Sequence, residues 1–151
     1  MIKIIAIGRK HETWIADGLE RYQKRLKAPW NVEWVLLPHS AREGATARQE
    51  ESGRILDKLS PSDFVILLDE RGKLFDSPAL SRQIERVFPT GKTPVFIIGG
   101  AYGVDDALTA RANLVWSLSP LVFPHQLVRL ILTEQLYRAA EIAAGRPYHH
   151  E

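Results

Sequence analysis

Residues 94–144 decide the fold of this chain, and they open with Pro94-Val-Phe-Ile-Ile98 followed at once by Gly99-Gly100-Ala101-Tyr102-Gly103. A second apolar run, Leu114-Val-Trp-Ser-Leu118, leads into a loop framed by prolines, and an amphipathic segment then continues to Ala144. Glycine-rich and proline-framed loops directly after buried strands bring the backbone close to a ligand. This stretch therefore predicts a pocket that is built largely from backbone atoms.

Outside this stretch, short apolar runs alternate with helical patterns along the chain. Strands are predicted at residues 2–7, 32–37, 64–68, 95–98 and 114–118. Helices are predicted at residues 13–27, 46–59, 77–88, 105–112 and 127–144. This alternation predicts one α/β domain over residues 1–151, with a mostly parallel sheet covered by helices on both faces.

Two of these segments carry a more specific expectation. Residues 64–68 are apolar throughout, so this strand is expected at the centre of the sheet, with a loop at 69–73 after it. The first half of the 46–59 helix is almost entirely polar, and it is therefore expected to be exposed or mobile.

Composition excludes several classes of protein. The 151 residues include no cysteine, so disulfides, thiolate metal sites and cysteine nucleophiles are excluded. The net charge of +2 permits a nucleic-acid partner without requiring one. No stretch approaches the length of a membrane span, and the apolar start is too short for a signal peptide, which predicts a cytoplasmic protein. Adjacent histidines at positions 149 and 150 are weak evidence for a metal, and no metal site is predicted.

Ligands of open α/β sheets bind beyond the carboxyl ends of the strands, which here are the loops after Leu68, Ile98 and Leu118. The glycine spacing matches neither the dinucleotide fingerprint nor a phosphate-binding P-loop. No motif in the sequence therefore supports a site for a nicotinamide cofactor or a nucleoside triphosphate. The apolar residues 117–123 suit the wall of a site for a flat aromatic ligand such as adenine. A tight turn and a buried crossover remain the alternative readings of these two loops.

Several polar residues could carry chemistry, and each also has an ordinary structural reading. His125 begins the last helix, Asp69 and Glu70 follow a strand, and the chain ends in an aromatic and two imidazoles. Glu134 and Arg138 form an i,i+4 pair that needs no function. Tryptophans near the basic first helix would suit stacking on RNA, although core packing is the commoner role of tryptophan.

Taken together and in this order, the motifs resemble those of the ribosomal RNA large subunit methyltransferase H family (RlmH) of the SPOUT class. The motifs are Leu68-Asp69-x-x-Gly72-Lys73, Phe96-Ile-Ile-Gly99-Gly100-x-x-Gly103, Trp116-Ser117-Leu118-Ser119, Pro124-His125-x-Leu127-x-Arg129, Glu134-Gln135-Leu136-Tyr137-Arg138-Ala139 and Pro147-Tyr148-His149. The resemblance covers the whole length of the chain.

The resemblance implies a SPOUT-type trefoil knot near the C-terminus, a homodimer whose active site is completed across the interface, and S-adenosylmethionine as cofactor. It implies methylation of N3 of a pseudouridine in 23S rRNA, on assembled 70S ribosomes. By motif match, and together with the glycine turn, the expected cofactor contacts are Leu68, Gly99, Gly100, Gly103, Leu118, Ser119, Pro120, Leu121, Val122 and Phe123.

Methylation at an imide nitrogen requires loss of its proton, so a base is expected. His149 is the first candidate for this base and His125 the second, and Tyr148 is expected to stack on or position the target base. The family pattern places a basic residue after Tyr-His, whereas this chain has His150. The candidates for phosphate contacts are Arg9, Lys10, Arg129 and Arg146.

Two rival functions remain open at this point. One is a non-catalytic ribosome-assembly or RNA-binding protein with a vestigial pocket, which cofactor affinity would distinguish. The other is a SPOUT methyltransferase that acts on tRNA, which the choice of substrate RNA would distinguish.

Overall fold

The computed structural model describes residues 1–150, and its elements alternate between strand and helix as the sequence predicts. In chain order they are β1 (Ile2–Ile7), α1 (Thr13–Gln23), β2 (Val32–Leu37), α2 (Gly44–Leu56), β3 (Asp63–Leu74), α3 (Ser77–Val87), the short 3₁₀ helix η1 (Phe88–Thr90), β4 (Thr93–Ile98), α4 (Asp106–Arg111), β5 (Leu114–Ser117) and α5 (His125–Ala143).

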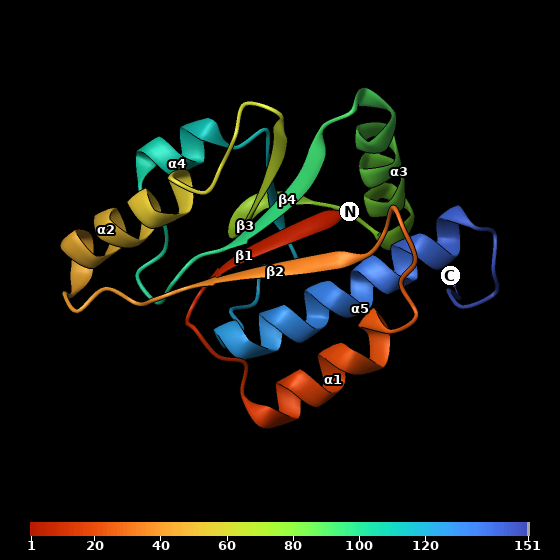
Figure 1. Cartoon of the computed structure of the whole chain (residues 1–151), viewed down its shortest axis with the longest axis horizontal. Coiled ribbons are helices and arrows are strands. Elements are labelled where there is room, and N and C mark those ends of the chain that lie inside the picture. Colours follow the sequence, from red (N-terminus) through yellow and green to blue (C-terminus); the bar gives the residue numbers. More distant parts are fainter. Residues whose placement is uncertain (151) are drawn as a thin grey trace.

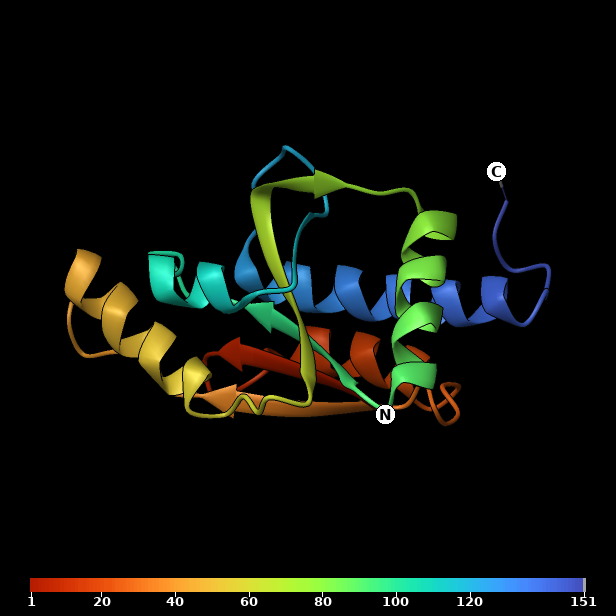
Figure 2. The ribbon, with the colours of Figure 1, turned by 90° about the horizontal axis from the view of Figure 1, so that it is seen from above.

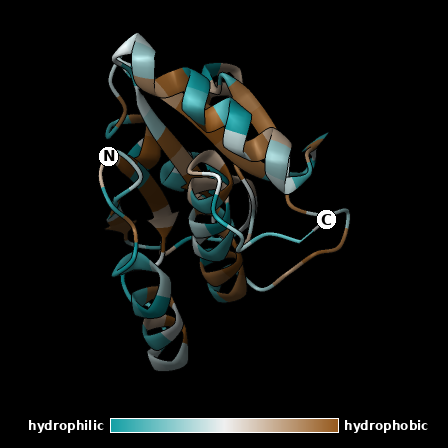
Figure 3. Ribbon diagram, turned by 90° about the vertical axis from the view of Figure 1, so that its right-hand side faces the viewer, coloured by the Kyte–Doolittle hydropathy of each residue, from teal (hydrophilic) through white to brown (hydrophobic). Residues whose placement is uncertain are grey.

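The strands form one sheet in the order β2-β1-β4-β3-β5, and all of its strand pairs are parallel. Alternate side chains of each strand point to opposite faces, where they build two separate cores. Helices lie on both sides of the sheet (Figures 1 and 2). One core is completed by α3 and α5, with α1 packed against α5, and the other by α2 and α4. Figure 3 shows the apolar colour along the strands and a mixture of apolar and polar colour on the helices. The predicted α/β fold with helices on both faces is confirmed.

β3 is an interior strand, as predicted, and it differs from its prediction in length. β4 lies at the centre of the sheet, and β3 lies between β4 and β5. The predicted loop at residues 69–73 is wrong, because β3 bends after Leu68 and pairs with β5 again at Lys73. Glycine makes the bend possible: a Cβ on Gly72 would lie 2.7 Å from the backbone of Val115.

Three helices also depart from their predicted bounds or exposure. α1 ends at Gln23 rather than at Lys27, and Leu26 is buried beyond it. α5 begins two residues earlier than predicted, directly after Pro124. The expectation that the first half of α2 is exposed is wrong at three positions, Ala47, Glu51 and Ser52, which are buried. Over residues 1–150, none of the helices combines the length and the apolar character that a membrane crossing requires.

Candidate functional site

A cavity of about 450 Å³ lies beside the bend of β3 and beyond the carboxyl ends of β4 and β5. Three segments that are far apart in the sequence surround it: the bend of β3, the glycine turn after β4, and the loop between β5 and α5. The lining residues are Leu68, Asp69, Glu70, Arg71, Ile98, Gly99, Gly100, Ala101, Gly103, Val104, Leu118, Ser119, Leu121, Val122, Phe123, His125 and Val128. The cavity therefore lies where ligands of open parallel sheets bind.

The glycine turn after β4 is a compact loop that exposes backbone to this cavity. The Gly103 N–H donates to the Gly100 carbonyl over 3.0 Å. Gly103 has φ of 77°, a left-handed conformation that residues with a side chain adopt only with strain. Gly99 is confined differently, because a Cβ there would lie 2.9 Å from Val104 Cγ1. At both positions glycine is the residue that this turn requires.

The loop after β5 presents apolar side chains at the opposite wall. Ser117 Oγ donates to the Ser119 carbonyl over 2.9 Å, and Ser119 Oγ accepts from the Leu121 N–H over 3.0 Å. These bonds hold a tight turn from which Leu121 and Val122 project with exposed fractions of 69% and 75%. Apolar side chains so exposed beside a cavity are available to cover a bound ligand or to contact a partner.

The ion pair of Asp69 and Arg71 lies at the third side of the cavity. Arg71 donates to Asp69 Oδ1 through Nε over 3.1 Å and to Oδ2 through Nη2 over 2.9 Å. The hydrogen bond from Arg71 is the main reason that the pKa of Asp69 is lowered. Asp69 is therefore ionised at neutral pH, and its carboxylate can attract a cation or accept from a hydroxyl group.

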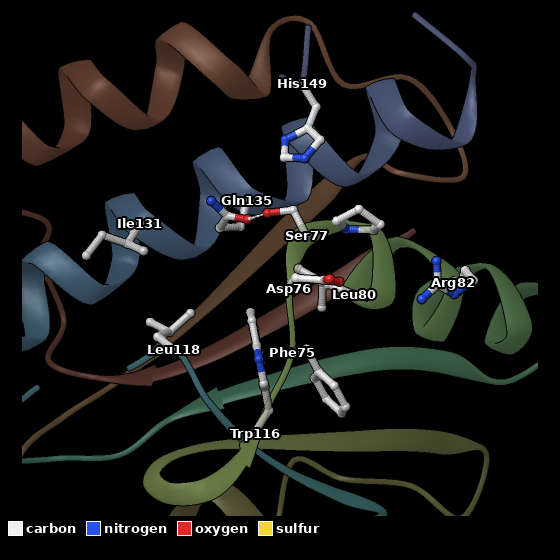
Figure 4. A pocket seen from close by; sticks show the side chains of 11 residues that line it. Phe75, Asp76, Ser77, Leu80, Arg82, Trp116, Leu118, Ile131, Gln135 and His149 are labelled. Carbon is white, nitrogen blue, oxygen red and sulfur yellow. Dashed lines mark hydrogen bonds between the residues drawn. The ribbon is translucent and has the colours of Figure 1, made fainter. Parts of the chain in front are cut away.

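A second cavity, of about 700 Å³, lies between the start of α3 and α5, and the C-terminal tail borders it (Figure 4). Phe75 and Trp116 contribute aromatic surface, Ser77 and Gln135 are hydrogen-bonded to each other over 2.7 Å, and His149 lies on its rim. Leu118 lines both cavities, which therefore adjoin at this residue.

The C-terminal tail, residues 147–150, is held against α5 by the Glu134–Arg138 ion pair of that helix. Arg138 contacts Glu134 Oε1 over 2.7 Å, lies 4.8 Å from the centre of the Tyr148 ring, and is 3.1 Å from His149 Nδ1. The Tyr148 hydroxyl donates to Glu134 Oε1 over 3.2 Å, and its ring packs edge-on against Tyr137. Burial, followed by the charge of Glu134, raises the pKa of Tyr148. The sequence alone assigned no function to the Glu134–Arg138 pair. In the structure this pair anchors Tyr148 and His149, two of the three candidate catalytic residues.

The structure brings most of the predicted cofactor residues together. Those that line the first cavity are Leu68, Gly99, Gly100, Gly103, Leu118, Ser119, Leu121, Val122 and Phe123. Pro120 does not line it. His125 lies at this cavity, whereas His149 lies at the second cavity and Tyr148 against α5. His149 therefore does not line the first cavity of its own chain.

The prediction that Arg129 contacts RNA phosphate is wrong, because this side chain is only 1% exposed. Its Nη2 donates to the carbonyls of Ile7 and Gly8, each over 3.0 Å, and its Nη1 donates to the Lys10 carbonyl over 3.0 Å. Arg129 instead holds the loop after β1 against α5. Arg9 and Lys10 on that loop are exposed, and Arg146 pairs with Glu141 over 3.0 Å.

Sequence reasoning missed several lining residues. Ile98, Ala101 and Val104 frame the glycine turn, and Val128 reaches the cavity from the first turn of α5. Val128 lies one helical turn after His125, a spacing of three that would have identified it once His125 was placed. Among residues 1–150 no group of three or more histidine, aspartate and glutamate side chains is arranged to hold a metal ion.

The family model described as "Predicted SPOUT methyltransferase" matches residues 1–149. Ribosomal RNA large subunit methyltransferase H of Hahella chejuensis is 40% identical over 154 residues, and the alignment covers 99% of both chains. The protein of the same name from Gloeobacter violaceus is 41% identical, covering 99% of this chain and 98% of that one. The structure of the SpoU methyltransferase AviRb of Streptomyces viridochromogenes, in complex with AdoMet, aligns with a TM-score of 0.48 and 11% identity, over 97% of this chain and 59% of that one.

Proposed function

We propose that this chain, which belongs to the SPOUT methyltransferase family and within it to the ribosomal RNA large subunit methyltransferases H, transfers a methyl group from S-adenosylmethionine to 23S rRNA. One observation carries the proposal: the bend of β3, the glycine turn and the loop after β5 meet around a single cavity at the carboxyl edge of the sheet. Nearly all the residues expected to contact the cofactor lie there.

The cavity fits S-adenosylmethionine in size and in chemistry. Its volume of about 450 Å³ is within the usual range for small-molecule sites, roughly 300–1,000 Å³. Leu118, Leu121 and Phe123 offer apolar surface to an adenine ring, and the glycine turn offers backbone. Asp69 supplies a carboxylate for ribose hydroxyls or for the positive sulfonium. When bound, the cofactor supplies an electrophilic methyl group.

The remaining requirement is removal of a proton from the nitrogen that accepts the methyl group. We propose His149 as the base that accepts this proton. Its Nδ1 accepts from Arg138 Nη1 over 3.1 Å, so the neutral ring carries its own proton on Nε2, and Nδ1 becomes free to act as the base once Arg138 releases it. Tyr148 contacts Glu134 and Tyr137, and its proposed role is to position the target base. His125, which borders the cofactor cavity, is the second candidate for the base.

A second copy of the chain would bring the tail and the cofactor cavity together. His149 borders the second cavity of its own chain, so a homodimer in which the tail of one copy faces the first cavity of the other would complete the site. The exposed Leu121 and Val122 support this arrangement, because a partner would cover them. The trefoil knot remains part of the proposal, as does a single methyltransferase domain over residues 1–151.

The proposed target is N3 of a pseudouridine in the 23S rRNA of assembled 70S ribosomes, in the cytoplasm. Exposed Arg9 and Lys10 on the loop after β1, together with Arg146, are the proposed phosphate contacts. With a net charge of only +2, the shape of the ribosome rather than charge alone would select the substrate.

Methyl transfer from radiolabelled S-adenosylmethionine tests the function directly. The purified protein is offered 70S ribosomes, separated subunits, free 23S rRNA and bulk tRNA in parallel. Label in 23S rRNA of 70S ribosomes, and none in tRNA, is expected. Label in tRNA alone would keep the chemistry and overturn the substrate. Absence of both label and cofactor binding would favour a non-catalytic RNA-binding protein.

A further inference from the structure

Glu51 is a buried carboxylate that the proposed reaction leaves without a role. It lies near the middle of α2, and it is only 3% exposed. Its Oε2 accepts from the Ser40 N–H over 2.9 Å and is 3.8 Å from His39 Nδ1. Its Oε1 is buried and has no hydrogen-bond partner in the part of the chain that the structure describes. A buried polar atom left unpaired is rare, so its retention calls for a physical reason.

The reason lies in what Oε1 touches. A Cβ on Gly100 would overlap Glu51 Oε1, and would also lie 3.3 Å from Ile7 Cγ2. Gly100 is buried and belongs to the turn that lines the cofactor cavity. The carboxylate thus forms the support directly behind the glycine turn, on the side that faces away from the ligand, and keeps the turn from moving back towards α2.

The next residue of α2 holds the other end of the same turn. Ser52 is fully buried, and its Oγ accepts from the Asp105 N–H over 2.9 Å. Asp105 in turn caps α4 by accepting from the Leu108 N–H. One turn of α2 therefore contacts the cofactor loop at its start, Gly100, and at its end, Asp105.

We propose that Glu51 and Ser52 are positioning residues that set the affinity for the cofactor by holding the turn from Gly99 to Asp105 in its binding conformation. They act through the backbone of the turn and do not line the cavity themselves. Preorganised loops bind more tightly because less ordering accompanies binding. The inference rests on the proposed function, since it concerns binding of S-adenosylmethionine.

The test is calorimetric titration of S-adenosylmethionine into wild-type protein, Glu51→Ala, Glu51→Gln and Ser52→Ala, at a temperature where circular dichroism shows each protein folded. Glu51→Ala is expected to raise Kd at least tenfold and Ser52→Ala at least threefold. Glu51→Gln still accepts from Ser40 and still fills the space behind Gly100, so its Kd is expected to stay within threefold. Glu50→Ala is the matched control, because Glu50 is an exposed neighbour that bonds Ser40 Oγ; its Kd is expected to match wild type.

Hydrogen exchange gives a second readout that a general loss of stability would not produce. Amides 99–105 are expected to exchange at least tenfold faster in Glu51→Ala, while those of β1 keep their protection. Wild-type affinity in folded Glu51→Ala, or a Glu51→Gln as weak as Glu51→Ala, would overturn the proposal. If Glu51→Ala does not fold, the Kd of Ser52→Ala for S-adenosylmethionine tests the proposal. A wild-type Kd in Ser52→Ala would then overturn the proposal. Wild-type protein that binds no cofactor would instead count against the proposed function.

Discussion

At the scale of single residues, the clearest structural role belongs to Arg129. Its guanidinium satisfies three carbonyls at the end of β1 and is almost completely buried. Arg129→Met would remove the donor from the buried Ile7 and Gly8 carbonyls, whereas the Lys10 carbonyl still accepts from Gln126 Nε2. Each buried carbonyl left unpaired costs about 1–3 kcal/mol. We expect a loss of about 2–4 kcal/mol in the free energy of unfolding by urea. Arg9→Met, on the exposed neighbouring loop, is the control, and it should change stability by about 0.5 kcal/mol or less. Equal values for the two variants would contradict this role.

His11 makes stability depend on pH. Burial, followed by the charge of Arg129, lowers the pKa of His11, whose Nδ1 lies 3.1 Å from Arg129 Nη1. The unfolded chain therefore takes up this proton at a higher pH than the folded protein does, so stability falls as the pH drops below the ordinary histidine value, about 6.5. We expect Tm to decrease between pH 7.5 and 5.5, and His11→Gln to reduce that decrease. An identical decrease in wild type and variant would show that His11 does not contribute.

The candidate base gives the third prediction at this scale. His149→Ala is expected to lower kcat by about 10²–10⁴-fold, the usual contribution of a general base. Its Kd for S-adenosylmethionine should stay near the wild-type value, because the proposed role of His149 is to take a proton from the target base and not to hold the cofactor. Turnover at the wild-type rate would remove His149 from this role and leave His125 as the candidate.

At the scale of elements, the glycine turn allows a matched comparison. Gly103 and Gly91 have nearly the same φ, 77° and 78°, and neither would place a Cβ against another atom. Alanine at either position should therefore cost a similar strain energy, about 1–2 kcal/mol. Only Gly103 lines the cavity, so Gly103→Ala should weaken binding of S-adenosylmethionine about tenfold while Gly91→Ala leaves it unchanged. Titration calorimetry measures the difference, and equal affinities would show that the turn is not part of the cofactor site.

Periodicity was sufficient to predict the order of elements, because buried strands and amphipathic helices each leave a regular apolar pattern. It could not predict the bend of β3, which depends on Gly72 approaching the backbone of Val115. It also missed the burial of Glu51 and Ser52, because polar contacts rather than apolar ones hold that part of α2. Short-range pattern is informative about apolar burial and says little about close backbone contacts or buried hydrogen bonds.

At the scale of the whole molecule, the separation of tail and cofactor cavity has a consequence for mixed dimers. His149→Ala lacks the proposed base, and Gly103→Ala weakens the proposed cofactor site. If the tail of one copy serves the cavity of the other, a heterodimer of the two variants contains one intact composite site. Co-expressed and co-purified mixtures should therefore recover activity well above either variant alone. Mixtures no more active than the single variants would contradict the shared site.

The location of the cofactor cavity could be predicted from the spacing of strands and loops. The positions of the tail residues Tyr148 and His149 relative to that cavity could not. The bend after Leu68 and the loops after Ile98 and Leu118 belong to or follow neighbouring parallel strands, so their convergence follows from the fold class. The position of Tyr148 and His149 depends on Glu134 and Arg138 of α5, and in the proposed homodimer the cavity that they face belongs to the second copy. A pattern within one chain carries no information about which copy supplies which residue.

The central claim is that this chain methylates a pseudouridine of 23S rRNA, and nucleoside mass spectrometry tests it most directly. 70S ribosomes that lack the modification are incubated with the protein and with S-adenosylmethionine carrying a trideuterated methyl group, and the 23S rRNA is then digested to nucleosides. The account predicts one trideuterated nucleoside, with the mass and retention of N3-methylpseudouridine. A deuterated methyl group on any other nucleoside, or none in 23S rRNA, would contradict it.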